Sequence, residues 1–162
     1  MKTGKKWRAL ARFFIKKEIS IFTSNKRRTK ETATFFSQPS IPLDTLDEIS
    51  SGMCDSMTYD TIARLRPDIK AGRKKDKYNY RYPDGESYRD LIWRARTAIW
   101  AIESQQKDTL VIGHRAVNRC IYSYFIHTDT AQIPYIDIPL GKIMRIRPHE
   151  HPHCHAEIIE YE

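Results

Sequence analysis

A short apolar segment that ends at a glycine and leads directly into a helical pattern most constrains how this chain can fold. Residues 109–113 (TLVIG) are uniformly apolar, as expected for a strand buried in a parallel sheet. The residues from Arg115 to His127 have helical spacing, and His114 lies between the two segments. A strand end facing a helix N-terminus is a natural anion site, because free backbone N–H groups point outward there. The segment therefore predicts an α/β fold with a candidate anion site at His114.

The rest of the chain alternates between helix and strand patterns, without internal repeats, and this order also favours an α/β domain. The 67–85 stretch is polar, basic and weakly periodic, and is predicted to be a functional loop or excursion. The other predicted elements are an amphipathic helix carrying Trp7, Leu10, Ala11 and Phe14, a strand at 19–23, a helix from a Ser24 cap to about Phe36, a short helix from about Thr58, and a C-terminal hairpin of 142–147 and 156–161.

The clearest predicted helix follows a turn at 83–85. Ser87 and Asp90 have the spacing of a capping box, which marks its start. One face of this helix is apolar and is predicted to be buried: Tyr88, Leu91, Ile92, Ala95, Ile99 and Ile102. The opposite face is predicted to point to water, and carries Arg89, Arg94, Arg96 and Glu103.

Composition predicts a single globular domain spanning residues 1–162. The chain is 40% hydrophobic and 11% aromatic, which suits one domain with a real core. No apolar run approaches the roughly 20 residues that span a bilayer, and the N-terminus lacks a signal-peptide pattern. We therefore expect a soluble protein located in the cytoplasm. The widely spaced Cys54, Cys120 and Cys154 indicate neither a disulfide framework nor a cysteine-based zinc site.

The formal net charge of +8 favours anionic partners, either polyanions or small phosphorylated metabolites. Basic residues cluster at 26–30 and 73–77, and the second cluster precedes Tyr78, Tyr80 and Tyr82. That arrangement resembles an aromatic platform for nucleic acid, but no nucleic-acid-binding motif accompanies it. A pocket for a phosphorylated ligand is therefore favoured over nucleic-acid binding and over a merely solvated surface.

No metal or cofactor is predicted. His149, His151, His153 and His155 occupy alternate positions and would share one face of an extended segment, as zinc, nickel or copper ligands could. Prolines interrupt this row, so a solvated hairpin turn is favoured. The glycines do not form a GxxxxGK[ST] phosphate loop, so this chain is not expected to bind ATP.

Three stretches together carry a family resemblance. LDEISSGMCDSMTYDTI (46–62), GRKKDKYNYRYPDGESYRDLIWR (72–94) and VIGHRAVNRCIYSYF (111–125) closely resemble the fructose-2,6-bisphosphatase domain of the bifunctional 6-phosphofructo-2-kinase/fructose-2,6-bisphosphatases. These domains are members of the histidine phosphatase superfamily. The resemblance covers nearly the whole chain. It implies an α/β, phosphoglycerate-mutase-like three-layer sandwich and hydrolysis of fructose 2,6-bisphosphate through a phosphohistidine.

The resemblance also implies roles for particular residues. Glu48 matches the acid that protonates the departing sugar oxygen, Arg28 matches the arginine that clamps the phosphoryl group, and His114 matches a histidine that donates to it. Considered singly, Glu48 reads as a surface carboxylate and His114 as a packed ring. Arg115 stands where the family usually carries a glutamine that helps bind substrate. The positions that match the sugar and 6-phosphate cradle are Tyr59, Arg73, Lys77, Tyr88 and Arg119.

The largest departure from the family is that these 162 residues contain no Arg-His-Gly triplet, the motif of the nucleophilic histidine. We expect an N-terminally truncated domain that lacks the family's first central strand and is inactive by itself. In the complete protein, a homodimer or an attached kinase domain is expected. The alternative is a non-catalytic phosphosugar-binding remnant or regulatory module. A basic metal-binding or nucleic-acid-binding protein is a weaker third reading.

Overall fold

The computed structural model describes residues 7–8, 11–12, 14, 17–147 and 155–159. Trp7, Arg8, Ala11 and Arg12 are helical, as predicted, and Leu10 lies outside the described residues. The elements that follow are β1 (Ser20–Thr23), α2 (Arg27–Ala33), β2 (Ser40–Pro42), η1 (Asp44–Leu46), η2 (Gly52–Cys54), α3 (Tyr59–Leu65), α4 (Pro67–Lys75), α5 (Tyr88–Glu103), β3 (Thr109–Ile112), α6 (Arg115–Ile126), η3 (Thr130–Tyr135), β4 (Ile143–Arg147) and β5 (His155–Ile159).

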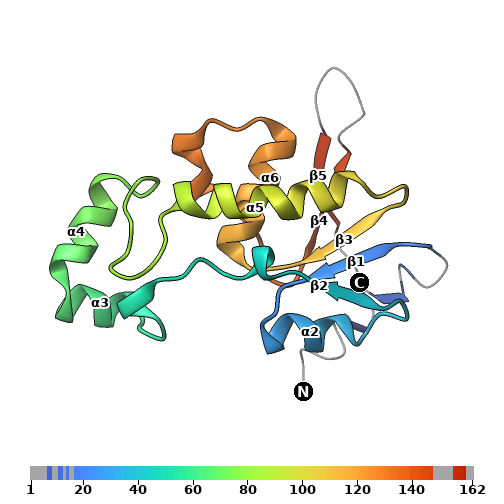
Figure 1. Cartoon of the computed structure of the whole chain (residues 1–162), viewed down its shortest axis with the longest axis horizontal. Helices are drawn as coiled ribbons and strands as arrows, with labels where there is room; N and C mark the ends of the chain where they lie inside the picture. The colour runs from blue at the N-terminus through green and yellow to red at the C-terminus, as the bar shows by residue number, and fades with distance from the viewer. Residues whose placement is uncertain (1–6, 9–10, 13, 15–16, 148–154, 160–162) are drawn as a thin grey trace.

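In the described ranges, three parallel strands form the central sheet in the order β2-β1-β3, with Phe22 of β1 opposite Ile41 and Val111. Because side chains alternate along β1, Ile21 packs against Phe14 and Phe36 on one face, while Phe22 packs with α5 and α6 on the other. The helices α5 and α6 cover one face and α2 lies on the opposite side (Figure 1). This layered α/β arrangement is the predicted fold class.

The strand β3 is less buried than its sequence predicts. All four residues of β1 are buried, whereas all four residues of β3 have intermediate exposure. β1 has strand neighbours on both sides, but within the described ranges β3 pairs only with β1. β4 and β5 form a separate antiparallel pair, as the predicted hairpin requires.

Capping residues in the sequence predicted the starts of α3 and α5 correctly. The Ser87 hydroxyl accepts a hydrogen bond from Asp90 N, and the Asp90 carboxylate accepts one from Ser87 N, so the predicted capping box opens α5. Thr58 caps α3 in the same way, through the N–H of Thr61. Leu91, Ala95 and the other core residues of α5 lie in the main hydrophobic cluster with α6.

Two local predictions were wrong. The helix expected from a Ser24 cap is shorter: α2 begins at Arg27 after Lys26 and ends at Ala33. It begins later because the Ser24 hydroxyl lies outside the helix, where it accepts a hydrogen bond from Lys26 N and bonds Thr29 and His114. The stretch predicted as a loop at 67–85 contains the helix α4, in which buried Ile69 is the apolar anchor. Pro67 at its first position has the dihedral angle that a helix start requires.

None of the helices in the described ranges is both long and apolar enough to cross a membrane. The same residues contain no group of three or more His, Cys, Asp or Glu side chains that could hold a metal ion. His149, His151 and His153 lie outside the described residues, and His155 begins β5.

Candidate functional site

The turn after β1 brings Arg28 and His114 into direct contact. Nε and Nη2 of Arg28 lie 3.1 and 2.8 Å from His114 Nδ1, and Ser24 Oγ lies 2.7 Å from His114 Nε2. A guanidinium can only donate, so Nδ1 accepts, and the single proton of the neutral ring lies on Nε2 and is donated to Ser24. The imidazole is therefore held as one defined tautomer.

Burial keeps His114 neutral. The side chain is almost wholly enclosed, and burial together with the Arg28 charge lowers its pKa to about 4, although Asp47 acts in the opposite direction. The neutral ring donates from Nε2, at the point where β3 ends and α6 begins. An anion that replaced Ser24 as its partner would receive a hydrogen bond from this ring.

Glu48 lies at the N-terminus of α6. Its Oε1 atom accepts hydrogen bonds from the backbone N–H groups of Ile49, at 3.0 Å, and Ala116, at 3.2 Å. The N-terminal end of a helix carries partial positive charge, which favours a carboxylate at this place. The carboxyl group is thus held at Ala116, in the first turn of α6 and two residues after His114.

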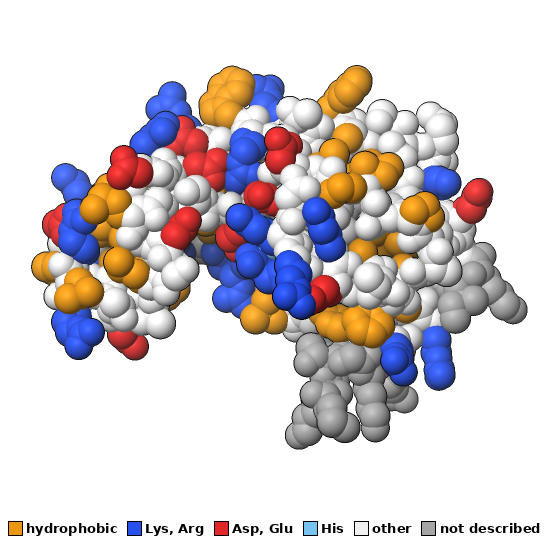
Figure 2. Space-filling view, turned by 60° about the horizontal axis from the view of Figure 1, so that its bottom comes forward, with side chains coloured by type: hydrophobic (Ala, Val, Ile, Leu, Met, Phe, Trp, Pro, Cys, Tyr) orange, Lys and Arg blue, Asp and Glu red, His pale blue; other side chains and the backbone are white. Residues whose placement is uncertain are grey.

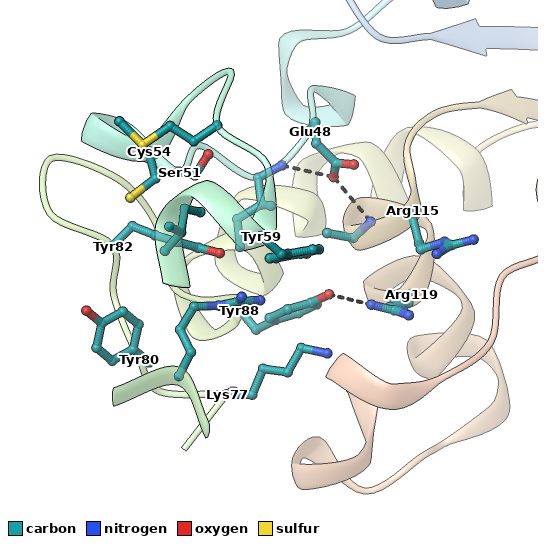
Figure 3. Close-up of a pocket in the computed structure, with 15 residues that line it drawn as sticks. Glu48, Ser51, Cys54, Tyr59, Lys77, Tyr80, Tyr82, Tyr88, Arg115 and Arg119 are labelled. Carbon is teal, nitrogen blue, oxygen red and sulfur yellow. Dashed lines mark hydrogen bonds between the residues drawn. The ribbon is translucent and has the colours of Figure 1, made fainter. Parts of the chain in front are cut away.

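A cavity of about 230 Å³ opens beside Glu48 (Figure 3). Glu48 lies at one end, and Lys77, Tyr88 and Arg119 lie toward the other. The cavity brings together seven of the nine predicted site residues: Glu48, Tyr59, Arg73, Lys77, Tyr88, Arg115 and Arg119. Arg28 and His114 are not among its lining residues and form the adjoining pair described above. Figure 2 shows Lys and Arg side chains gathered near the middle of one face, beside the end of the molecule built by α3 and α4.

Neighbouring groups hold the cations at the far end. Arg119 donates to Tyr88 Oη at 2.9 Å and to the carbonyl of Ile136 at 2.6 Å. The guanidinium of Arg73 lies 5.2 Å from the ring centre of Tyr59 and 5.1 Å from that of Tyr82. An anion entering this end would meet donors whose positions are already defined.

Lys77 links the 67–85 stretch to η3. Its Nζ donates to the carbonyl of Pro134 at 2.8 Å and lies 4.6 Å from the ring centre of Tyr135. Burial lowers the pKa of Lys77 to about 8, and the charges of Arg119 and Arg73 act in the same direction. An anion placed among the three cations would relieve this repulsion.

Arg115 is exposed at the first position of α6 and lines the cavity next to Glu48. It adds a further positive charge at the Glu48 end, where the resemblance leads one to expect a glutamine. Among the described residues that line the cavity, Glu48 is the one carboxylate, so this lining carries a surplus of positive charge.

Reasoning from sequence missed several residues that shape this site. Arg94, predicted to point to water, instead donates to the carboxylate of Glu86 and to loop carbonyls that include that of Glu48. Pro134 and Tyr135, which contact Lys77, were not identified at all. Two positions in the sequence could have indicated the contact between Arg94 and Glu86: Arg94 borders the apolar face of α5, and Glu86 lies just before the helix cap.

The profile of the histidine phosphatase superfamily, branch 1, matches residues 4–156. The chain therefore belongs to the histidine phosphatase superfamily. Within it, the fructose-2,6-bisphosphatase of Saccharomyces cerevisiae is 38% identical over 130 residues, which cover 80% of this chain and 28% of that protein. Human 6-phosphofructo-2-kinase/fructose-2,6-bisphosphatase 1 is 40% identical over 143 residues, which cover 86% of this chain and 30% of that protein. These relatives confirm the family resemblance, and the chain spans less than a third of their length.

Solved structures share the fold at lower sequence identity. Bacillus stearothermophilus YhfR superposes with a TM-score of 0.79 at 20% identity, covering 98% of this chain and 82% of that one. A putative alpha-ribazole-5'-P phosphatase from Escherichia coli gives a TM-score of 0.81 at 13% identity, covering 96% of this chain and 79% of that one. The fold is therefore that of the histidine phosphatases.

Proposed function

We propose that this chain is a fructose-2,6-bisphosphate 2-phosphatase domain. The carrying observation is the cavity that places one carboxylate, Glu48, at a helix N-terminus and several cations at the opposite end. A sugar bearing two phosphates fits this cavity, because its 6-phosphate would meet the cations at the far end and its 2-phosphate would lie beside Arg115 and the adjoining Arg28–His114 pair. The names of the yeast and human relatives support the same substrate.

Each group has a defined part in the proposed reaction. Glu48 protonates the sugar oxygen as the 2-phosphate leaves, and Arg28 and His114 donate to the transferring phosphoryl oxygens. Arg73, Lys77 and Arg119 bind the 6-phosphate, because charge-assisted hydrogen bonds to phosphate are stronger than neutral ones. Tyr59 and Tyr88 line the sugar between them. Arg115 is the last of the proposed substrate-binding residues, and it lies nearer Glu48 and the 2-phosphate.

The proposed nucleophile is the histidine of an Arg-His-Gly triplet, which is not among these 162 residues. This observation favours a second candidate, in which the chain binds the phosphosugar without turnover. The two candidates share the same ligand and differ only in phosphate release. In the catalytic candidate, the complete protein resembles its bifunctional relatives and carries a kinase domain in the same cytoplasmic chain.

Calorimetric titration of the 162-residue chain with fructose 2,6-bisphosphate tests the pocket. Lys77→Met should weaken binding by about tenfold or more, because one charge-assisted contact is lost. Lys75→Met is the matched control, since Lys75 is exposed at the end of α4 and does not line the cavity. No binding, or equal binding by the two variants, would overturn the proposal.

Phosphate release by the full-length native protein decides between the two candidates, because the 162-residue chain does not hold the proposed nucleophile. Release from fructose 2,6-bisphosphate that is slowed strongly by Glu48→Gln supports the catalytic reading and the role of Glu48 as acid. Binding without release, retained in Glu48→Gln, supports the binding module. Release that is indifferent to Glu48→Gln contradicts the role given to this residue.

A further inference from the structure

Arg94 is the most heavily engaged side chain in the part of the chain that the structure describes, and the proposed reaction has not yet used it. Its Nε and Nη2 donate to the two carboxylate oxygens of Glu86 at 2.8 and 2.9 Å. This paired geometry fixes the plane of the guanidinium. The two side chains are 25% and 20% exposed, so the pair is screened by solvent much less than an exposed ion pair.

The outer edge of the same guanidinium faces the chain segment that leads into Glu48. Nη1 of Arg94 donates to the carbonyls of Thr45, at 3.0 Å, and Asp47, at 3.1 Å. Longer contacts join it to the carbonyl of Asp44 at 3.3 Å and, through Nη2, to that of Glu48 itself at 3.4 Å. One side chain on α5 thus holds successive peptide groups of the segment that ends at the proposed acid.

Glu86 extends the attachment to the other side of Glu48. Its Oε2 accepts a hydrogen bond from Ser50 N at 2.9 Å, while Glu86 N donates to the Ser50 carbonyl at 2.8 Å. The second of these bonds joins backbone to backbone, as does the bond from Met53 N to the Pro83 carbonyl at 3.1 Å. The residues before and after Glu48 are therefore attached to one ion pair and to the turn that precedes α5.

We propose that the Arg94–Glu86 pair positions Glu48, by holding the backbone on both sides of it so that its carboxyl group stays at the N-terminus of α6. This proposal rests on the proposed function, because the position matters only if Glu48 is the acid. Arg94 acts through Glu48 and does not line the cavity, so it is a positioning residue. The Glu48 carboxylate itself is held only by the N–H groups of Ile49 and Ala116 among the hydrogen bonds of the described residues.

The test compares Arg94→Lys with Arg96→Lys. Lysine keeps the charge but cannot make the paired contact or reach several carbonyls at once. Arg96 is an exposed residue of the same helix whose guanidinium lies over Trp93, so its replacement is the matched control. Amide hydrogen exchange at Ile49, Ser50 and Ala116 is the first readout, with the amides of β1 as the internal standard.

In Arg94→Lys, exchange at these three amides should rise by about tenfold relative to β1, because the segment opens locally. Arg96→Lys should leave the ratio unchanged. Exchange at these amides that is as slow in Arg94→Lys as in the wild type would overturn the proposal. An equal rise in β1 would also overturn it, because that result reports only a loss of overall stability. This readout needs no ligand, so it stands even if the proposed function fails.

The affinity of the chain for fructose 2,6-bisphosphate is the second readout. The Glu48 carboxylate repels the nearby phosphoryl group, so Glu48→Gln should tighten binding severalfold. Arg94→Lys should also tighten binding, because a displaced carboxylate repels less. It should have no further effect on the affinity in the Glu48→Gln background. A change of the same size in both backgrounds would show that Arg94 does not act through Glu48. Absence of binding by the wild type would count against the proposed function, while the exchange result still tests the positioning.

Discussion

His114 owes its charge state to its nearest neighbours. The ring accepts from Arg28 at Nδ1 and donates to Ser24 at Nε2, so a second proton would have to displace the guanidinium. Its pKa is lowered to about 4 from an ordinary value of 6.5, with burial as the largest cause and the Arg28 charge next. The folded protein therefore excludes a proton that the unfolded chain binds readily.

This exclusion predicts acid sensitivity. A depressed pKa contributes stability that is fully present above pH 6.5 and is lost as the pH falls toward 4. Over this range the loss from His114 should be about 3 kcal/mol, since each pKa unit corresponds to about 1.4 kcal/mol. Urea unfolding of His114→Asn at a series of pH values should show a correspondingly smaller acid loss. His127→Asn is the control, because His127 is exposed and asparagine tolerates its left-handed backbone. Equal acid losses in the two variants would contradict the prediction.

At the scale of elements, the loop carrying Glu48 and the turn before α5 pack backbone against backbone. Gly52 makes this approach possible: its φ is +52°, and an added Cβ would lie 2.0 Å from the carbonyl oxygen of Pro83. Gly113 differs, because a Cβ there would meet the end of the Asn118 side chain at 2.5 Å. A side chain can move away, whereas hydrogen-bonded backbone cannot do so without opening the loop.

Gly52→Ala should therefore destabilise the protein far more than Gly113→Ala. We expect a loss of about 3 kcal/mol or more for the first, which combines strain at positive φ with a backbone clash, and about 1 kcal/mol for the second. Urea unfolding of both variants measures the difference. Similar losses, or a larger one for Gly113→Ala, would show that the two backbone segments are not in firm contact.

For the whole molecule, the strand order decides where the sheet is most stable. β1 lies between β2 and β3 and is buried throughout, whereas β3 has one strand neighbour among the described residues and intermediate exposure. The apolar sequence of β3 is thus not matched by equal burial. The arrangement makes β1 the centre of the sheet, with hydrophobic clusters on both of its faces.

Amide exchange of the wild-type chain should follow this order. The amides of β1 should exchange most slowly, and those of β3 should be on average about tenfold faster, because an edge strand opens more readily. Residue-resolved exchange measured by NMR checks the ranking, with the helices α5 and α6 as a common reference. Protection of β3 equal to that of β1 would mean that the second edge of β3 is covered.

Sequence alone was sufficient for features that depend on near neighbours. Ser87 and Asp90 are three residues apart, so the capping box and the start of α5 were readable directly, as was the helix after His114. Seven predicted site residues meet in the cavity, and they were found through the family motifs. The helix α4 was missed because the polar, basic stretch around it has a weak apolar period.

Only the tertiary structure decided the properties that depend on distant segments. The role of Arg94 depends on a carbonyl 46 residues away, and Lys77 contacts a carbonyl 57 residues away, so no local pattern reveals either one. The exposure of β3 likewise follows from which strands lie beside it. Residue spacing along the chain determines turns, caps and apolar faces, because these involve a few adjacent peptide groups. Hydrogen-bond partners, burial and the resulting pKa values are set by chain segments that meet only after folding.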